Sequence, residues 1–225
     1  MAVRPRHDGR DARGDPTNRE IPGLLCRVAV GLLPVTGASM SLYSHGLPVR
    51  LGASNAQASC MGDLQATLGD GPCRSAVRAR APVLADDLTC PEDAGRWPVF
   101  AERATAAGVR AAYAIPLGDD AVCVGTLDLY RDTPGALTGG ELDTARRLAA
   151  LMTAALTTLG GLTDGHDDVH QATGMIMAQL GVSDGDALAR LRGHAFAHDR
   201  TVVDVAREVV GRRMRFELEE AEEPE

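Results

Sequence analysis

The spacing of apolar residues divides the chain into a mixed N-terminal part and a helical C-terminal part. Between residues 20 and 160, short runs of alternating apolar and polar side chains lie between segments in which apolar residues recur every three or four positions. The first pattern is typical of strands and the second of amphipathic helices. Beyond residue 160 only the helical spacing remains. The pattern therefore predicts an α+β domain followed by an all-α domain.

The N-terminal part is predicted to alternate between helices and strands. A first helix begins near Pro22, and its apolar residues Leu24, Leu25, Val28 and Leu32 are expected to form its buried stripe. Strands are predicted at residues 38–43, 47–53, 82–86, 110–117 and 121–130, and further helices at 55–68, 73–79, 97–107 and 141–159.

The last of these helices has a clear start and a continuous apolar face. Thr138 and Glu141 have the spacing of a capping box, in which each side chain satisfies a backbone amide of the other residue. The face is a candidate dimer surface and consists of Leu148, Leu151, Met152, Ala155 and Leu159.

Residues 161–216 are predicted to form three short helices that pack together. Asp168, Ser183 and Thr201 each precede a polar residue by three positions, which is the pattern of an N-cap and its partner. The predicted helices span residues 168–180, 184–197 and 201–215. Helices this short are marginal alone, so they must share a core. In the last helix an apolar stripe of Val202, Val205, Ala206 and Val209 leaves Arg200, Arg207 and Arg215 pointing outward.

Composition and charge narrow the class of protein. All 23 basic residues are arginine, and the net charge of −8 argues against non-specific coating of nucleic acid. Five cysteines without C-x-x-C spacing fit reduced thiols in a cytoplasmic protein. The longest uncharged run, residues 148–163, falls short of a membrane span, so we expect a soluble cytoplasmic protein with no membrane partner.

Candidate chemistry outside the helical part is sparse. Cys73 lies at a predicted helix start, where a redox-active thiolate and a buried structural thiol are both open interpretations. The histidine pairs 166/170 and 194/198 have metal-ligand spacing but no third ligand, so ordinary packing histidines are favoured. No catalytic constellation stands out, and we expect neither enzymatic activity, a metal nor a bound cofactor.

Three motifs make residues 22–160 similar to a GAF domain. They are Gly69-Asp70-Gly71-Pro72-Cys73, the Pro-Val strand at 82–87 and the strand Gly125–Tyr130. The resemblance implies a six-stranded antiparallel sheet flanked by helices, with a small-ligand pocket or a dimer surface. The identity of a GAF ligand stays open.

Residues 169–210 resemble an ANTAR domain, a transcription-antitermination RNA-binding module. The resemblance rests on Gln-Ala-x-Gly-x-x-Met at 171–177, Leu-Gly-Val-Ser at 180–183, Ala-x-x-x-Leu-Arg at 187–192 and Asp-Val-Ala-Arg at 204–207. Where the family frequently has lysine, this chain has Thr173. The resemblance implies a homodimeric antitermination regulator that binds paired RNA hairpin loops under control of the GAF domain. The expected RNA contacts are Ala172, Thr173, Gly174, Arg192, Arg200 and Arg207.

Two other functions stay open at this point. A three-helix bundle with arginines on its last helix also suits a DNA-binding transcription factor, and a ligand or redox sensor would use the bundle for dimerisation. The expected division is a disordered arm at 1–19, a GAF-like sensor at 20–160, an ANTAR-like domain at 161–216 and an acidic tail at 217–225. The tail is interpreted as a solubility tail, or alternatively as a phosphate mimic facing the arginines.

Overall fold

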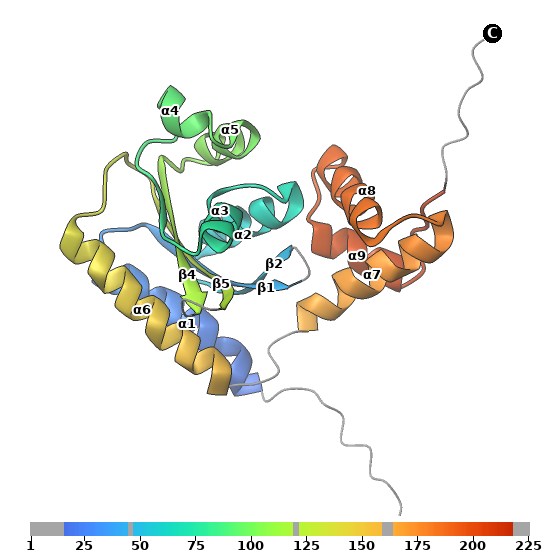
Figure 1. The fold of residues 1–225 in the computed structure, drawn as a ribbon, viewed down its shortest axis with the longest axis horizontal. Helices are drawn as coiled ribbons and strands as arrows, with labels where there is room; N and C mark the ends of the chain where they lie inside the picture. Colours follow the sequence, from blue (N-terminus) through green and yellow to red (C-terminus); the bar gives the residue numbers. More distant parts are fainter. Residues whose placement is uncertain (1–15, 45–46, 119–121, 159–163, 218–225) are drawn as a thin grey trace, which may run out of the picture.

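The computed structural model describes residues 16–44, 47–118, 122–158 and 164–217 (Figure 1). An α+β unit is followed by a three-helix bundle that lies beside it. Most of the predicted N-terminal arm, the tips of two hairpins, the Gly160-Gly161 break and the acidic tail beyond Glu217 lie outside the described residues. The expected α+β class followed by an all-α bundle is confirmed.

The described strands form one antiparallel sheet in the order β2-β1-β5-β4-β3. Five strands are present in the described residues, where the resemblance implied six. Among the described strands, the short edge strand β3 pairs with β4 alone. The bounds are β1 (Gly37–Ser44), β2 (Leu47–Ala53), β3 (Val83–Ala85), β4 (Ala111–Gly118) and β5 (Cys123–Arg131).

Helices cover both faces of the sheet. One face is covered by α1 (Pro16–Leu32) and α6 (Gly139–Thr158), which lie side by side (Figure 1). The other face is covered by α2 (Ala56–Leu68) and α3 (Pro72–Ala79). Beyond β3 the chain forms α4 (Pro91–Ala94), for which the sequence predicted no helix, and α5 (Pro98–Ala106). None of the described helices is long and apolar enough to span a membrane.

The predicted buried stripe of α1 is wrong for three of its four residues, and only Leu25 packs partly buried against the core. Leu24, Val28 and Leu32 are 52%, 41% and 61% exposed, whereas the smaller Cys26 and Ala29 are fully buried against the sheet. Small side chains let the helix lie close to the strands, and Leu24, Val28 and Leu32 are left on its outer face. The helix also begins at Pro16, with Pro22 inside it rather than at its start.

The predicted face of α6 is divided between core and surface. Leu148 and Met152 are buried in the core, while Leu151 is 65% exposed; Leu159 lies outside the described residues. The capping box is confirmed: the Thr138 amide donates to Glu141 Oε2 at 2.7 Å, and the Glu141 amide donates to Thr138 Oγ1 at 3.3 Å.

The bundle consists of α7 (Asp164–Leu180), α8 (Asp184–Ala197) and α9 (Val202–Val210) around one apolar core. Ser183 and Thr201 are N-caps as predicted, since their side chains accept from the amides of Asp186 and Asp204. Asp168 is not, because α7 begins four residues earlier. The last helix ends at Val210, five residues before the predicted end, and Arg215 follows it in an irregular segment.

Candidate nucleic-acid interface

The three candidate residues on α7 have different positions. Ala172 and Thr173 are buried in the bundle core, and Thr173 Oγ1 donates to the Val169 carbonyl at 2.8 Å within the helix. Gly174 is exposed, and a Cβ built on it would meet nothing within 4 Å. The first two therefore support the helix from inside, and only Gly174 offers a surface that a ligand can approach closely.

Arg207 projects from α9 with its side chain 57% exposed. Its Nε lies 3.2 Å from Asp168 Oδ2, and its Nη1 lies 3.5 Å from Asp204 Oδ1. Exposed ion pairs of this kind contribute up to about 1 kcal/mol each. A phosphate group can therefore replace these carboxylates as the partner of the Arg207 guanidinium.

Arg200 is held more firmly than Arg207. Its two terminal nitrogens each lie 2.9 Å from a carboxylate oxygen of Glu208, which makes a two-point ion pair. The bond to Glu208 raises the pKa of Arg200 and lowers the pKa of Glu208. Another ligand would have to compete with Glu208 for these two nitrogens.

Arg192 lies apart from the other candidates, at the junction with the GAF domain. Its guanidinium is next to Gly69, the left-handed residue that ends α2. Burial, followed by the nearby charge of Arg74, lowers the pKa of Arg192. The structure therefore does not bring the six predicted residues to one surface.

Sequence reasoning did not include the arginines after α9 among the RNA contacts. Arg212 and Arg215 line a groove of about 450 Å³ together with Met175 and Ala178 of α7. Gly174 lies one turn before Ala178 and so shares its side of the helix. Their position directly after the last helix could have suggested these arginines as candidates. Their proximity to α7, however, depends on the chain turn at Arg212, which has a φ of 54°.

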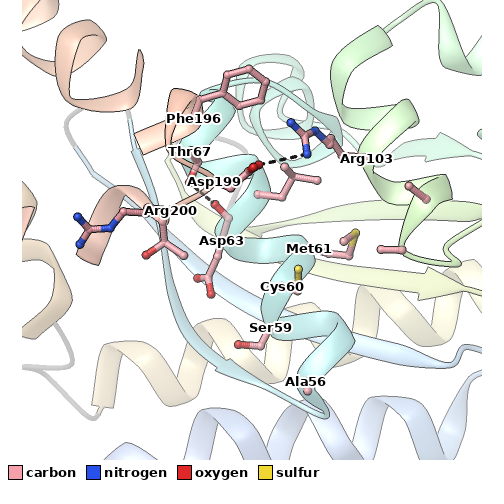
Figure 2. A pocket seen from close by; sticks show the side chains of 14 residues that line it. Ala56, Ser59, Cys60, Met61, Asp63, Thr67, Arg103, Phe196, Asp199 and Arg200 are labelled. Carbon is pink, nitrogen blue, oxygen red and sulfur yellow. Dashed lines mark hydrogen bonds and ion pairs between the residues drawn. The ribbon is translucent and has the colours of Figure 1, made fainter. Parts of the chain in front are cut away.

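A second hollow lies where the GAF domain meets the bundle (Figure 2). It has a volume of about 640 Å³ and lies between α2, α5 and the corner that joins α8 to α9. Figure 2 shows Arg103 and Asp199 joined across it, while the side chain of Arg200 extends away from that pair. Its charged residues already have ion-pair partners within the protein.

A polar cluster is buried between the sheet and α2. Ser39 and Asp128 are opposite each other on β1 and β5, and Ser39 Oγ would lie 3.5 Å from a Cβ at Gly62 of α2. Gln65 of α2 donates to Tyr130 Oη at 3.1 Å and accepts from the Cys73 amide at 2.9 Å. The side chain of Gln65 thus ties α2 to both the sheet and the start of α3.

Cys73 is a buried structural thiol. Burial, followed by the charge of Asp128, raises the pKa of Cys73 well above its usual value. This outweighs any stabilisation of a thiolate by the helix start, and the Cys73 amide is bonded to Gln65 rather than open to a ligand. Of the exposed or half-exposed cysteines, Cys60 borders the hollow at the domain junction.

His194 and His198 have packing partners rather than a set of metal ligands. Within the described part of the chain, no three histidine, cysteine or acidic residues are grouped as metal ligands would be. His194 and His198 stack with ring centroids 4.1 Å apart, and His194 also meets Phe216 edge-on. The side chain of His166 lies outside the part of the chain that the structure describes.

The structure is an α+β domain joined to a three-helix module, and each part matches a known family. Residues 19–157 match the GAF domain family and residues 163–210 match the ANTAR domain family. The chain belongs to the GAF family and is a GAF and ANTAR domain-containing protein. GAF domains indicate sensing and ANTAR domains indicate RNA-binding antitermination control, and both are regulatory modules.

Solved structures agree with the fold of the first domain. A domain assigned to a two-component sensor histidine kinase protein of Sinorhizobium meliloti 1021 is 17% identical, with a TM-score of 0.51 over 62% of this chain and 90% of its own. The GAF domain region of a protein assigned to the membrane in Geobacter sulfurreducens PCA is 14% identical, with a TM-score of 0.52 over 63% of this chain and 94% of its own. No curated protein matches the sequence.

Proposed function

We propose that this chain is a transcription antitermination regulator that binds paired RNA hairpin loops through its C-terminal bundle. The observation that carries the proposal is the ANTAR match over 163–210, which spans almost the whole bundle. The loop bases of a hairpin are splayed and accessible, so a protein can stack on them while arginines hold the flanking phosphates.

Two parts of the bundle surface support this role. Arg207 is exposed and held only by weak ion pairs, so it is available to a phosphate. Gly174 presents bare backbone on α7, next to the groove bordered by Arg212 and Arg215. We propose these four residues as primary contacts, with Arg192 and Arg200 contributing after their present contacts are released.

The outer face of α1 and α6 is proposed as the homodimer surface. Leu24, Val28 and Leu32 form a stripe at intervals of four residues, and Leu151 of the neighbouring α6 is also exposed. Contiguous exposed aliphatic side chains are typical of surfaces that bind another protein. A dimer gives two bundles, one for each hairpin of a paired RNA.

Binding would act on transcription by shifting an equilibrium between RNA folds. Protein bound to the hairpin pair stabilises that fold at the expense of a competing terminator hairpin. The shift is limited by the difference in affinity for the two folds. The GAF domain, with an unidentified small molecule as its signal, sets how much of the protein can bind.

The proposal is tested by selection and competition. A pool of transcripts with two short hairpins and randomised loops is selected on the full-length protein, and the enriched RNA is then competed with a single hairpin and with duplex DNA of the same sequence. We expect enrichment and resistance to both competitors. Stronger competition by the duplex would instead favour a DNA-binding factor, and a pool without enrichment would reject the proposal.

Arg207→Ala provides the residue-level test, and Arg146→Ala is a matched control. Both arginines form a 3.5 Å ion pair with an aspartate three residues earlier, and both are similarly exposed, at 57% and 55%. Arg146 lies on the GAF domain. Loss of one phosphate contact should weaken RNA binding and reduce the salt slope by about one in Arg207→Ala only. Equal behaviour of the two variants would reject Arg207 as a contact.

A further inference from the structure

The C-terminal end of α2 packs into the helical bundle. Ala66 belongs to the same apolar cluster as Val205 and Leu191, so one side chain of the GAF domain is part of the ANTAR core. Contacts of α2 reach both α8 and α9. The two domains therefore share a built interface along this helix.

Thr67 joins the domains through its hydroxyl group. Its Oγ1 donates to the Asp63 carbonyl at 2.8 Å within α2 and accepts from the Val202 amide at 3.2 Å. Val202 is the first residue of α9, so its N–H has no partner within its own helix. The GAF domain thus accepts a hydrogen bond from the Val202 amide, which would be exposed to water if the domains separated.

Arg103 holds the corner between α8 and α9 from the side of α5. Its Nη1 lies 3.3 Å from Asp199 Oδ1, and its guanidinium lies 5.3 Å from the centre of the Phe196 ring. Both members of the ion pair are solvent-accessible. Such a pair orients the corner but adds little free energy, so this part of the interface can open.

Arg192 meets the end of α2 at Gly69. A Cβ on Gly69 would lie 2.6 Å from both Cζ and Nη1 of Arg192, so the guanidinium rests on the bare glycine. Arg74 of α3 donates to the Gly69 carbonyl. Two cations thus converge on one helix end. The helix dipole favours cations there, but their mutual repulsion weakens the hold.

From these contacts we infer that α2 is an internal competitor of RNA for the Arg192 side of the bundle. The inference rests on the proposed function and names its regulation. RNA phosphates and the end of α2 cannot both occupy the space around the Arg192 guanidinium. The docked arrangement is the form of low RNA affinity, and undocking exposes Arg192 and frees the start of α9.

The same helix connects this interface to the interior of the GAF domain. Gln65 lies two residues before Thr67 and is bonded to Tyr130 and to the Cys73 amide. A ligand that displaced the Gln65 side chain would move the turn that carries Ala66 and Thr67. One turn of α2 therefore carries both the contact with the GAF interior and the contacts that hold the bundle.

Gly69→Asn tests the competition, and Gly181→Asn controls for its backbone cost. Both glycines follow a helix with left-handed φ values of 64° and 65°, a conformation that asparagine tolerates better than most residues. A side chain at Gly69 displaces Arg192, whereas a Cβ at Gly181 meets nothing within 4 Å. The probe is the selected two-hairpin RNA, bound to full-length protein.

Gly69→Asn should bind this RNA more tightly than the wild type, and Gly181→Asn should not. If about nine-tenths of the wild-type molecules are docked, the RNA affinity of Gly69→Asn should be about tenfold higher. Hydrogen exchange at the Val202 amide reports docking independently of RNA. Exchange should accelerate in Gly69→Asn, and in the wild type when RNA is added.

Unchanged RNA affinity in Gly69→Asn together with faster Val202 exchange would overturn the inference and leave the proposed function intact. Unchanged or slower exchange in the wild type on adding RNA would also overturn it. A selection that yields no two-hairpin RNA bound by the wild type would reject the proposed function and the inference with it. Arg103 lies on α5, so Arg103→Glu should open the same interface from another helix by repelling Asp199. This variant must reproduce the effects of Gly69→Asn, which separates undocking from local misfolding at Gly69.

Discussion

Replacing Asp128 with asparagine tests how the buried polar cluster contributes to stability, because the change removes a charge and keeps the shape. Asp128 is only 2% exposed. Its Oδ2 accepts from Thr126 Oγ1 at 3.0 Å, and its Oδ1 has no hydrogen-bond partner among the described residues. Burial raises the pKa of Asp128 from 3.8 to about 7.

The raised pKa fixes the direction of the pH dependence. Between pH 3.8 and about 7 the folded protein keeps a proton that the unfolded chain has released, so the free energy of unfolding falls as pH rises through this window and is constant above it. The full difference corresponds to about 4 kcal/mol, of which about 2 kcal/mol falls between about pH 5.5 and pH 8. Asparagine has no proton to lose and can donate to Ser39, the residue opposite it.

Urea unfolding followed by tryptophan fluorescence measures the effect. Trp97 is the single tryptophan and is buried in the cluster that contains Tyr130, so it reports on the GAF domain. The advantage of Asp128→Asn over the wild type should grow by about 2 kcal/mol from about pH 5.5 to pH 8. Asp143→Asn, an exposed carboxylate on α6, should show no such trend. Parallel curves for the wild type and Asp128→Asn would refute the buried-carboxyl reasoning.

Three further outcomes follow from burial. Leu151→Asp places a charge on the proposed dimer surface, so light scattering should show monomers. An unchanged mass would show that the dimer interface does not include Leu151. Leu191→Ala removes a fully buried side chain and should lower the unfolding free energy of the bundle by about 2–5 kcal/mol in denaturant titrations, and a much smaller loss would contradict its central position. A thiol reagent followed by mass spectrometry should label exposed Cys60 before buried Cys73, whose raised pKa keeps it protonated, and early labelling of Cys73 would show that the domain opens there.

Local signals in the sequence predicted most of the elements. β2 was predicted with its observed bounds, and α2 and α8 were predicted to within one residue. Thr138, Ser183 and Thr201 were recognised as caps because a cap depends on residues three positions apart. The end of α9 was missed, because arginines at 212–215 are compatible with a helix and only the turn at Arg212 shows where it stops.

The side of each element that becomes buried was less predictable. On α1, size and hydrophobicity favoured Leu24, Val28 and Leu32 as the core, but close packing on the sheet requires the smaller Cys26 and Ala29. A polar residue in a strand, such as Asp128, gives no indication that it will be fully buried. Burial depends on partners that are distant in the chain, which local periodicity does not describe.

The sequence by itself determined the division into a mixed and a helical part and the match to the GAF and ANTAR families, because residue motifs and periodic spacing are properties of contiguous segments. Only the tertiary structure decided which arginines are accessible. Arg192, Arg200 and Arg207 are alike in sequence, yet one lies against Gly69, one is held by Glu208 and one is exposed. Their difference arises from packing between elements far apart in the chain, and above all from the docking of α2 on the bundle.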